Sequence, residues 1–578
     1  MKKHLLVLLG AACLFAAGCS DFCPFKKCAA PENVVKFDDF YKDGDDGLAA
    51  MAKILELVKS KNGAPTVVEF SSREYDFKKS PLGYLFGLEN IKNLTIDGRG
   101  AKILIDPYNS FCRILKCENV ALKNMDTSYS SLSFTQGEIV AVDKEKKFFV
   151  LRVQEGYPLL PSDEFTKKTY VEGWRWGSVI DPKIRSIKFG TIDAVFMQKI
   201  EPAAAPREYR IYPETRSRAM LGTVAVGDRY AMPVYGEPNP VFGAAGAGHS
   251  HISIVKSSNI LIENLKASAL KHMGFGGSLN TGAITFRNCS ITWRNGSDLI
   301  SSWRDGIHFK QNKVGPAIEN CRIEGLLDDS INFSAAPTRI VEELGGCKYK
   351  VIRAESMFAG CPLGIYYADT GKWVEGVKVV SIKNGVLETD KPIPNVVKWI
   401  EVSAADINNS TAAVHKNKGM TGLYNLEYLN AGFRIRKNYF GLQRRYAAII
   451  RSHDGVIEDN VLEGLPAGIL ISNEIGGWYE GAIPYNIKIS RNEFKGIWRT
   501  PLAFGMQSVS GARVPECANF EISGNKFYLS GNKPQIAVRV GNGKDYVFKG
   551  NEYFLGGKPL KESDAVEISP KASDVSFK

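Results

Sequence analysis

An asparagine-centred pattern recurs along most of the chain and limits the folds that the chain can adopt. In each copy an apolar residue is followed, two or three positions later, by Asn and then by another large apolar or aromatic residue. From Asn264 onward the intervals between these asparagines are 24, 32, 118, 22, 32, 33 and 26 residues. Fixed periods of ~20–50 residues are typical of stacked supersecondary units. The copies are centred on Asn124, Asn264, Asn288, Asn320, Asn438, Asn460, Asn492, Asn525 and Asn551.

Each repeated unit has the pattern of short β-strands. Runs rich in Ile, Val and Phe alternate with polar residues and are bounded by Gly, Asn and Ser. Asn side chains that stack in a column can hydrogen-bond from one turn to the next, as they do in cross-β ladders. The sequence therefore predicts an all-β protein, a right-handed parallel β-helix in which one repeat is one turn. An antiparallel sandwich with Asn-rich turns is the alternative, and it fits these intervals less well.

Two intervals are too long for a single turn and predict inserted β modules. They are the 140 residues that lead to Asn264 and the 118 that lead to Asn438. Both contain sequence that is typical of β-hairpins. In the second interval Asn384-Gly385 lies between two alternating runs, which is a strong hairpin signal. The expected organisation is an N-terminal cap with the first turns at 20–131, a small barrel-like β module at 132–240, β-helix turns at 241–336, a second module at 337–430 and the last turns at 431–578.

One helix is expected, near the start of the chain. Between Gly47 and Lys59 the apolar residues recur at helical spacing. The terminal turn of a solenoid exposes its apolar interior unless another element covers it. We therefore expect this helix to cap the N-terminal end of the β-helix.

The first residues of the chain have the features of an export signal. Lys2 and Lys3 precede a short apolar run that ends in small residues. Cys19 directly follows Ala17-Gly18, an arrangement that resembles a bacterial lipobox, in which the Cys becomes the lipidated N-terminus. No other apolar stretch approaches the ~20 residues of a membrane-spanning helix. We expect a lipoprotein signal peptide at 1–19, lipidation of Cys19, and an exported bacterial lipoprotein that a lipid anchor holds to the membrane of the cell envelope, at the outer membrane or the periplasmic face.

Charge and cysteine content exclude two classes of function. The formal net charge is +12, but the Lys and Arg residues are spread along the chain and not clustered as in a nucleic-acid footprint. None of the 11 Cys residues falls in a metal-binding spacing, so we expect no nucleic-acid partner, no metal and no cofactor. Disulfides are conceivable between Cys23 and Cys28 and between Cys112 and Cys117, whereas core positions are expected for Cys289 and Cys321, which directly follow repeat asparagines.

Three aspartates occupy corresponding places in two successive repeats. Asp305 is followed 23 residues later by Asp328, which is paired with Asp329. Because neighbouring strands are ~4.8 Å apart, the three carboxyl groups are expected on one wall of the solenoid. Two opposed carboxyl groups can carry out glycoside hydrolysis, and ~6.5–9.5 Å between them leaves room for the water of an inverting reaction. Like charges this close push their pKa values apart, so that one carboxyl group stays protonated as the acid.

Three short motifs lie within residues 250–500. They are Asp305-Gly306-Ile307-His308-Phe309, Asp328-Asp329-Ser330-Ile331-Asn332 and Trp478-Tyr479-Glu480-Gly481. On these motifs the chain resembles the α-1,3-galactosidases of glycoside hydrolase family 110, whose layout also includes inserted β modules. The resemblance implies a parallel β-helix and an inverting exo-glycosidase that removes a terminal α-linked galactose. Its catalytic acids would be Asp305, Asp328 and Asp329.

The polar and aromatic residues around these acids are expected to bind the sugar. His308 and Asn332 follow the acids at short intervals, and Trp478 and Glu480 lie together in the third motif. The chain departs from the family at Phe333, where the family has His, so the sugar itself stays open. The Arg-rich element of the family is also altered here, to a segment that begins Gln443-Arg444-Arg445. The expected substrate-binding residues are Arg304, His308, Asn332, Arg445, Trp478 and Glu480.

Other functions stay open alongside this one. The arrangement of the three aspartates also resembles polygalacturonases, although the Gly-His-Gly and Arg-Ile-Lys elements of that family are missing. A polysaccharide lyase, which would use Ca²⁺ or Arg to neutralise a uronate, is a related alternative. A non-enzymatic glycan-binding β-helix is the third. Each of these functions implies an oligo- or polysaccharide partner. The sequence does not decide the linkage, which Asp is the acid, or the oligomeric state.

Overall fold

The computed structural model describes eight stretches of the chain. They are residues 31–77, 83–106, 109–160, 176–234, 250–400, 417–476, 478–529 and 535–578. The export signal, Cys19, Cys23 and Cys28 lie outside these stretches, so the expectations about them stay predictions. Within the described residues, no helix combines the length and the apolar character that crossing a membrane requires.

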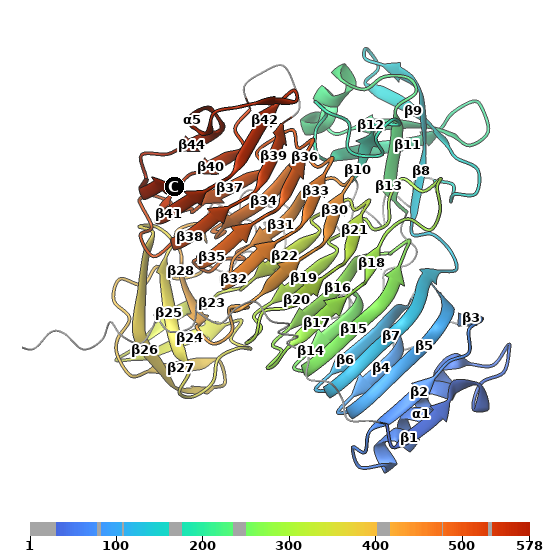
Figure 1. Cartoon of the computed structure of the whole chain (residues 1–578), viewed down its shortest axis with the longest axis horizontal. Helices are drawn as coiled ribbons and strands as arrows, with labels where there is room; N and C mark the ends of the chain where they lie inside the picture. The colour runs from blue at the N-terminus through green and yellow to red at the C-terminus, as the bar shows by residue number, and fades with distance from the viewer. Residues whose placement is uncertain are drawn as a thin grey trace, which may run out of the picture.

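Stacked parallel strands form an elongated solenoid along the whole molecule (Figure 1). One wall is an 11-stranded sheet in which each strand pairs with the equivalent strand of the next turn. This pairing confirms the predicted parallel β-helix. The wall consists of β4 (Tyr84–Glu89), β6 (Ser110–Leu115), β14 (Ser250–Val255), β16 (Met273–Ser278), β19 (Ile307–Lys310), β22 (Ile331–Ser334), β31 (Tyr446–Ile450), β34 (Ala467–Ser472), β37 (Leu502–Gly505), β40 (Val538–Val540) and β44 (Val566–Ile568).

The rest of the solenoid surface is one 22-stranded sheet that turns a corner. The corner is a residue with positive φ, such as Asn288 at φ 53°, which separates β17 from β18. The sheet comprises β1 (Asn33–Lys36), β2 (Thr66–Glu69), β3 (Glu74–Phe77), β5 (Lys92–Ile105), β7 (Glu118–Tyr129), β15 (Ser258–Ala267), β17 (Ile284–Arg287), β18 (Ser290–Ile291), β20 (Ala317–Glu319), β21 (Arg322–Glu324), β29 (Arg434–Arg436), β30 (Tyr439–Gly441), β32 (His453–Glu458), β33 (Val461–Glu463), β35 (Tyr485–Ser490), β36 (Glu493–Lys495), β38 (Ala518–Ser523), β39 (Lys526–Leu529), β41 (Gly543–Lys549), β42 (Glu552–Leu555), β43 (Lys558–Pro559) and β45 (Ala572–Phe577).

The repeat asparagines form two ladders and not the single column that the sequence suggested. In the first, Asn264, Asn288 and Asn320 occupy the positive-φ corner, and each amide donates to the Asn one turn earlier, as Asn320 Nδ2 does to Asn288 Oδ1 at 2.8 Å. From Asn438 onward the corner residue is another type, and the Asn sits one position further along, where Asn438, Asn460, Asn492 and Asn525 are buried. Asn460 Nδ2 there donates to Asn492 Oδ1 at 2.8 Å. The one-residue shift explains why the spacing before Asn varied between two and three positions.

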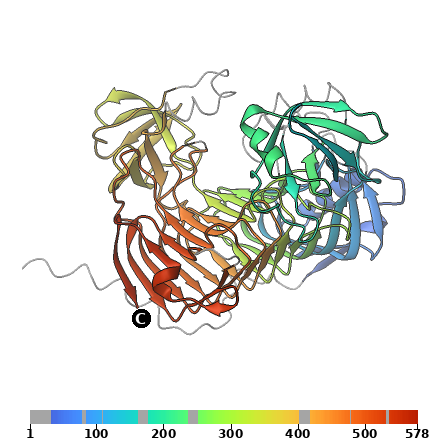
Figure 2. The same ribbon diagram turned by 90° about the horizontal axis from the view of Figure 1, so that it is seen from above.

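Two closed six-stranded barrels interrupt the solenoid, as the prediction of two inserted β modules requires. Figure 2 shows both on the same side of the β-helix. The first barrel, barrel 1, contains β8 (Phe134–Asp143), β9 (Phe148–Val153), β10 (Trp176–Ile180), β11 (Val195–Pro202), β12 (Glu208–Pro213) and β13 (Arg229–Pro233), with the 3₁₀ helix η2 (Thr215–Gly222) beside it. The second, barrel 2, contains β23 (Thr338–Gly345), β24 (Lys348–Ile352), β25 (Pro362–Tyr367), β26 (Lys372–Lys383), β27 (Val386–Thr389) and β28 (Thr421–Asn425).

The N-terminal end of the solenoid carries the expected helix. After the 3₁₀ turn η1 (Phe37–Asp39), helix α1 (Gly47–Ser60) begins at the N-cap Asp46, whose side chain accepts from Leu48 N at 2.9 Å. Gly47 is required there, because a Cβ would lie 1.9 Å from the Phe77 ring. The short helix α5 (Glu562–Ala565) lies near the other end.

Cysteine positions in the core differ partly from the expectation. Cys289 and Cys321 are buried in the apolar interior, as predicted. The conceivable Cys112–Cys117 disulfide is wrong, since both thiols are free and buried. Cys112 points into the core from β6, whereas Cys117 lies beyond the end of that strand and its thiol donates to Leu88 O at 3.5 Å.

Candidate active site

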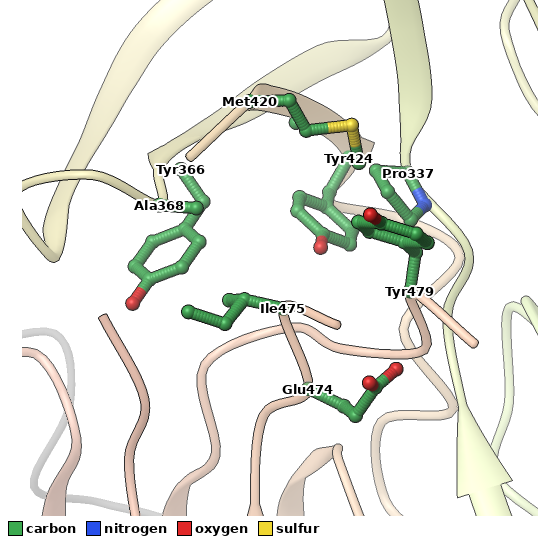
Figure 3. Close-up of a pocket in the computed structure, with 9 residues that line it drawn as sticks. Pro337, Tyr366, Ala368, Met420, Tyr424, Glu474, Ile475 and Tyr479 are labelled. Carbon is green, nitrogen blue, oxygen red and sulfur yellow. The ribbon is translucent and has the colours of Figure 1, made fainter. Parts of the chain in front are cut away.

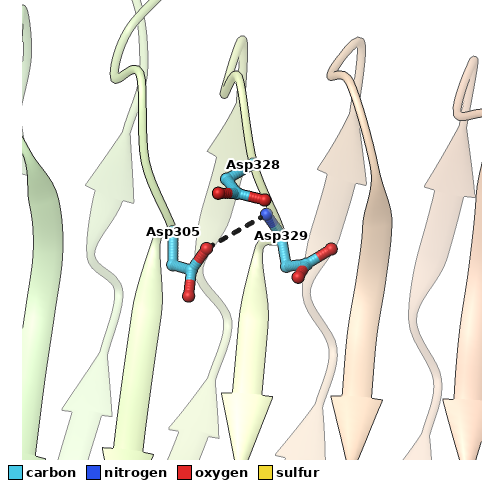
Figure 4. Close-up of side chains that lie close together, drawn as sticks. All are labelled: Asp305, Asp328 and Asp329. Atoms are coloured by element: carbon cyan, nitrogen blue, oxygen red, sulfur yellow. Dashed lines mark hydrogen bonds between the residues drawn. The ribbon is translucent and has the colours of Figure 1, made fainter. Parts of the chain in front are cut away.

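Strands β19 and β22 place the three aspartates side by side. β19 and β22 are neighbouring strands of the 11-stranded wall, and His308 of β19 lies opposite Asn332 of β22. Asp305 lies just before β19, and Asp328 and Asp329 lie just before β22 (Figure 4). The two repeats thus bring the three carboxyl groups onto one wall, as the spacing in the sequence required.

The local sequence explains why these strands pack so closely. Ile307 and Phe309 of β19 are in the apolar interior together with Ile331 and Phe333 of β22, which fixes the register of both strands. A Cβ at Gly306 would lie 2.8 Å from Ser330 O, so a glycine after Asp305 allows the two turns to approach. The side chains between the core residues, such as His308, are left to face away from the interior.

The three acids form a compact, buried cluster. Each offers a carboxylate oxygen within 4.8 Å of those of the other two, and their exposed fractions are 5–8%. Asp329 N donates to Asp305 Oδ1 at 3.4 Å, and Asp305 Oδ2 lies 2.6 Å from His308 Nδ1. These oxygens are closer together than the ~6.5–9.5 Å expected between carboxyl groups of an inverting pair. The range for an inverting pair refers to whole carboxyl groups and not to their nearest oxygens, so the expected separation stays a prediction.

Three arginines surround Asp328. Arg444 Nη2 lies 3.0 Å from its Oδ1, Arg304 Nη1 lies 3.4 Å from its Oδ2, and Arg445 Nη1 lies 3.9 Å from Oδ1. Burial alone would raise the pKa of Asp328, but the charges of Arg444, Arg445 and Arg304 outweigh it and hold the pKa below its ordinary value. Asp328 is therefore the ionised member of the adjacent pair.

Asp329 is in the opposite electrostatic state. Burial, and then the negative charge of Asp328, raise the pKa of Asp329 well above its ordinary value. Its Oδ1 accepts from Tyr446 N at 3.0 Å, and Arg445 Nε is 4.0 Å away. Two neighbouring residues of the chain thus differ in protonation, which is the arrangement that separates an acid from a base in a catalytic site.

A second carboxylate, Glu480, lies beside this cluster. Lys310 Nζ forms an ion pair with Glu480 Oε1, and Arg451 Nη1 lies 3.3 Å from Oε2. His308 links the two groups, because its Nε2 lies 3.7 Å from Glu480 Oε1 while its Nδ1 contacts Asp305. Burial would raise the pKa of Glu480, but Lys310, His308 and Arg451 lower it to about 2.

Most of the expected substrate-binding residues meet around the acids. Arg304, His308, Arg445 and Glu480 do so through the contacts above, and Asn332 accepts from Arg451 Nη1 at 3.2 Å and donates toward Glu480. Trp478 does not: it is 67% exposed on a turn, and no contact joins it to the acids among the described residues. The substrate roles of all six residues stay predictions.

Four further residues of this region were missing from the expected site. Arg444, Arg451 and Lys310 are next to or between the expected residues, and their ion pairs with buried acids could have been anticipated only from the register of the strands. Asp193 comes from the loop between β10 and β11 of barrel 1 and lies 3.3 Å from Arg444 Nη1. Nothing in the local sequence around Asp193 indicates this contact, since it depends on how barrel 1 docks.

The donor set around the acids fits a metal ion poorly. Asp305, Asp328 and Asp329 each offer one oxygen to a common point, whereas Ca²⁺ takes ~6–8 oxygen ligands. Besides His308, the neighbours within the described part of the chain are the guanidinium groups of Arg304, Arg444 and Arg445, which repel a cation. The geometry therefore favours proton transfer between carboxyl groups over cation binding.

Two cavities flank the region without being lined by the acids. One is a small pocket between barrel 2 and the loop that carries Glu480 (Figure 3). Tyr424, Glu474 and Tyr479 line it, and Glu474 Oε2 accepts from Glu480 N at 3.0 Å. The other is a small pocket under barrel 1 that includes Arg185 and Arg444 in its lining.

The fold and the acid cluster define a parallel β-helix protein with a carboxyl site suited to acid–base chemistry. Among known proteins, the chain is 24% identical over 534 residues to α-1,3-galactosidase B of Bacteroides thetaiotaomicron, covering 86% of this chain and 81% of that protein. It is 23% identical over 517 residues to α-1,3-galactosidase A of Akkermansia muciniphila, covering 86% of this chain and 79% of that one. The predicted resemblance to α-1,3-galactosidases is confirmed.

Other comparisons add no further argument about function. No protein-family model matches the chain. Among solved structures, an exopolygalacturonase from Thermotoga maritima aligns with a TM-score of 0.37 at 11% identity, covering 94% of this chain and 94% of that one.

Proposed function

We propose that this protein is an exported, inverting exo-glycoside hydrolase that removes a terminal α-linked galactose from glycans. The observation that carries the proposal is the buried cluster of Asp305, Asp328 and Asp329, in which the surroundings shift the pKa values of Asp328 and Asp329 in opposite directions. Such a pair supplies a proton donor beside a stabilising anion, which is the requirement of glycosidic bond cleavage. The galactose specificity is supported by the relatives, which are named α-1,3-galactosidases.

The geometry supports a role for each acid. Asp329, kept protonated, gives its proton to the glycosidic oxygen as the bond to the anomeric carbon breaks. Asp305, oriented by His308 at 2.6 Å, takes a proton from the water whose oxygen forms the new bond from the opposite face. Asp328 stays ionised and stabilises the positive charge that develops on the sugar ring.

The residues around Glu480 are suited to holding the sugar. Glu480, Asn332 and Arg451 form a hydrogen-bonded group whose members are all buried. Carboxylate, amide and guanidinium groups are strong hydrogen-bond partners for sugar hydroxyls. Arg304 and Arg445 would contact the substrate from the side of Asp328, and the exposed Trp478 would offer an aromatic face at the rim.

The stereochemistry of the product tests this proposal most directly. Purified protein should release galactose from aryl α-galactosides and from α-1,3-linked galactose disaccharides, with β-galactose as the first anomer seen by proton NMR. This measurement is decisive because attack by water from the face opposite the leaving group must invert the anomeric carbon. Fresh α-galactose would show retention and would overturn the inverting mechanism, and the absence of any galactose release would overturn the activity.

A polysaccharide lyase is the second candidate, because the arginines and Lys310 around the site could neutralise a uronate. Elimination leaves an unsaturated sugar that absorbs in the ultraviolet, whereas hydrolysis does not. We expect activity that survives EDTA and releases a saturated monosaccharide. Chelator-sensitive activity with rising ultraviolet absorbance would favour the lyase.

We also propose that the protein is anchored to the cell envelope through a lipid on Cys19. The lipobox-like segment before Cys19 supports this, since lipidation of that Cys would follow removal of residues 1–18. Expression in a bacterium with radiolabelled palmitate should label the wild-type chain and not Cys19→Ser. Equal labelling of both chains would contradict the anchor.

A further inference from the structure

One buried cation near the site has no anionic partner. Arg339, the second residue of β23 in barrel 2, is 6% exposed, and its Nε is fully buried without a hydrogen bond. Among the described residues, no carboxylate or carbonyl oxygen accepts a hydrogen bond from its guanidinium group. An unpaired charge in such a place is costly unless a partner arrives with a ligand.

The other arginines with the same exposed fraction show what is missing. Arg444 and Arg451 are also 6% exposed, and each has a buried carboxylate within 3.3 Å. Burial, and then the positive charge of Arg353, lower the pKa of Arg339 to about 10. The protein therefore neutralises Arg444 and Arg451 itself but leaves Arg339 without a counter-charge.

Aromatic rings hold this guanidinium group in a defined place. Its central carbon lies 3.9 Å from the ring centre of Trp399 and 5.1 Å from that of Tyr479. The two rings meet edge to face at 5.1 Å. Cation–π contacts of this kind fix a guanidinium plane while leaving its N–H edge able to bind an oxyanion.

The position of Arg339 connects it to the candidate active site. Tyr479 directly precedes Glu480, whose carboxylate contacts His308, and His308 contacts Asp305. The cation thus lies on the barrel 2 side of the group that we propose holds the sugar. A group bound at Arg339 would belong to the part of the glycan beyond the galactose.

We propose that Arg339, Trp399 and Tyr479 form a subsite for an anionic substituent, a carboxylate or a sulfate, on the sugar that follows the terminal galactose. The guanidinium group would pair with that oxyanion and the half-buried Trp399 would pack on the sugar, whereas the buried ring of Tyr479 holds the guanidinium group in place. This inference rests on the proposed function, and it names the substrate class as acidic glycans. The net charge of +12 is consistent with such a substrate.

The first experiment compares substrates with the wild-type protein. Three disaccharides carry the same terminal α-galactose on a neutral hexose, a hexuronate or a sulfated hexose. We expect kcat/KM to be at least about tenfold higher for one or both acidic substrates, the usual worth of a hydrogen bond to a charged group. Equal kcat/KM on all three would overturn the subsite, and the carboxylate and sulfate arms tell which oxyanion it takes.

The second experiment uses the ratio of acidic to neutral kcat/KM in variants. Arg339→Met keeps the packing on Trp399 without the charge and should reduce that ratio about tenfold or more, and Arg339→Lys should reduce it less. Lys348→Gln is the matched control, because it removes an exposed positive charge of the same barrel that does not act on Arg339, and it should leave the ratio unchanged. A folding defect would lower both rates and not their ratio. An unchanged ratio in Arg339→Met would overturn the proposal.

A binding measurement separates failure of this inference from failure of the proposed function. If no galactoside is cleaved, the proposed hydrolase activity fails, and calorimetry with the uncleaved neutral, hexuronate and sulfated disaccharides still tests the subsite. Tighter binding of an acidic disaccharide by the wild type than by Arg339→Met would support the subsite. Equal affinities in the two proteins would overturn it.

Discussion

Two groups of buried carboxylates lie next to each other on one side of the solenoid, and they differ in protonation. The acid cluster consists of Asp305, Asp328 and Asp329, and the second group is centred on Glu480. Their exposed fractions are alike, at 5–8% for the aspartates and 6% for Glu480. Burial acts in the same direction on all of them, since it favours the neutral carboxyl group.

The difference lies in how the positive charges are distributed. Glu480 alone faces Lys310, His308 and Arg451, and its pKa falls to about 2. In the acid cluster the arginines lie closest to Asp328, so that Asp329 meets burial and the charge of Asp328, which raise its pKa. The position of each cation, and not the degree of burial, therefore decides which carboxyl group keeps a proton. We therefore expect proton transfer at the acid cluster and substrate binding at the group around Glu480.

The largest effect should come from removing the proton donor. Asp329→Asn is expected to lower kcat on an aryl α-galactoside by ~10²–10⁴-fold, the typical worth of acid–base catalysis, because Asn cannot supply the proton. Asp305→Asn and Asp328→Asn should each lose at least ~10²-fold, and Asp126→Asn, on another part of the solenoid, should lose nothing. Circular dichroism should show the native fold in all four. Near-normal turnover in any two of the three cluster variants would contradict the proposal that the acid cluster transfers the protons.

Glu480→Gln should instead act on stability and on substrate binding, and not on proton transfer. It leaves Lys310 and the buried Arg451 without their partner, and removing one member of a buried pair costs ~3 kcal/mol in the free energy of unfolding. Urea unfolding at pH 7 measures this loss.

The pH dependence of that stability is a second test of Glu480. Its folded pKa is about 2 against an ordinary 4.5, so its contribution is present above pH ~4.5 and is lost as the pH falls toward 2. The variant should therefore lose less stability than the wild type across this acid range. A variant as stable as the wild type at pH 7 would show that the ion pairs contribute nothing.

The fold could be predicted from the sequence because the residue types of the repeat, at this spacing, are typical of few other folds. Alternating Ile and Phe, bounded by Asn and Gly, specified parallel turns, and the two long intervals indicated the barrels. The two Asn ladders were missed because they differ by one residue, and φ decides between them. Asn288 itself occupies the corner with positive φ. In a later turn Lys437 occupies that corner, and Asn438, one position further along, lies in the interior.

The candidate site was predicted less completely for a physical reason. Contacts between adjacent turns, such as Asp305 with Asp329, follow from the repeat length. Contacts that depend on loops and barrels do not, and Asp193 and Arg339 come from such segments. The protonation states were also out of reach, because they depend on where Arg444 and Arg445 point.

Arg445→Met sharpens the comparison by removing one cation from the acid cluster. Arg445 lowers the pKa of Asp329, which burial and Asp328 raise, so the variant should raise that pKa further. A protonated acid is required, and activity is lost as the pH rises through the pKa of Asp329. The alkaline limb of kcat should therefore move to higher pH. Arg513→Met, on the surface, should not move it, and a downward shift would contradict the assignment of Asp329 as the acid.

The smallest effect is expected at Asp193, where barrel 1 touches the acid cluster. Its carboxylate lies 3.3 Å from Arg444 Nη1 and 3.8 Å from Arg445 Nε, and its side chain is 33% exposed. Arg444 also lies 4.6 Å from the ring centre of Trp176, so barrel 1 holds this arginine from two directions. Partly exposed ion pairs contribute less than ~1 kcal/mol, so Asp193→Asn should lower kcat/KM only about two- to fivefold.

The Asp193 result also decides what barrel 1 does. Glu214→Gln, which removes another acid of barrel 1 that pairs with Arg216, is the matched control and should leave kcat/KM unchanged. A fall of more than ~10²-fold in Asp193→Asn would place Asp193 among the catalytic acids, because a positioning contact through Arg444 cannot supply that much. An unchanged kcat/KM in Asp193→Asn would show that this contact from barrel 1 does not affect the acid cluster. A two- to fivefold fall would show that a different barrel contacts each group of carboxylates. Asp193 belongs to barrel 1, whereas Tyr479, beside Glu480, packs against Trp399 and against Arg339 of barrel 2.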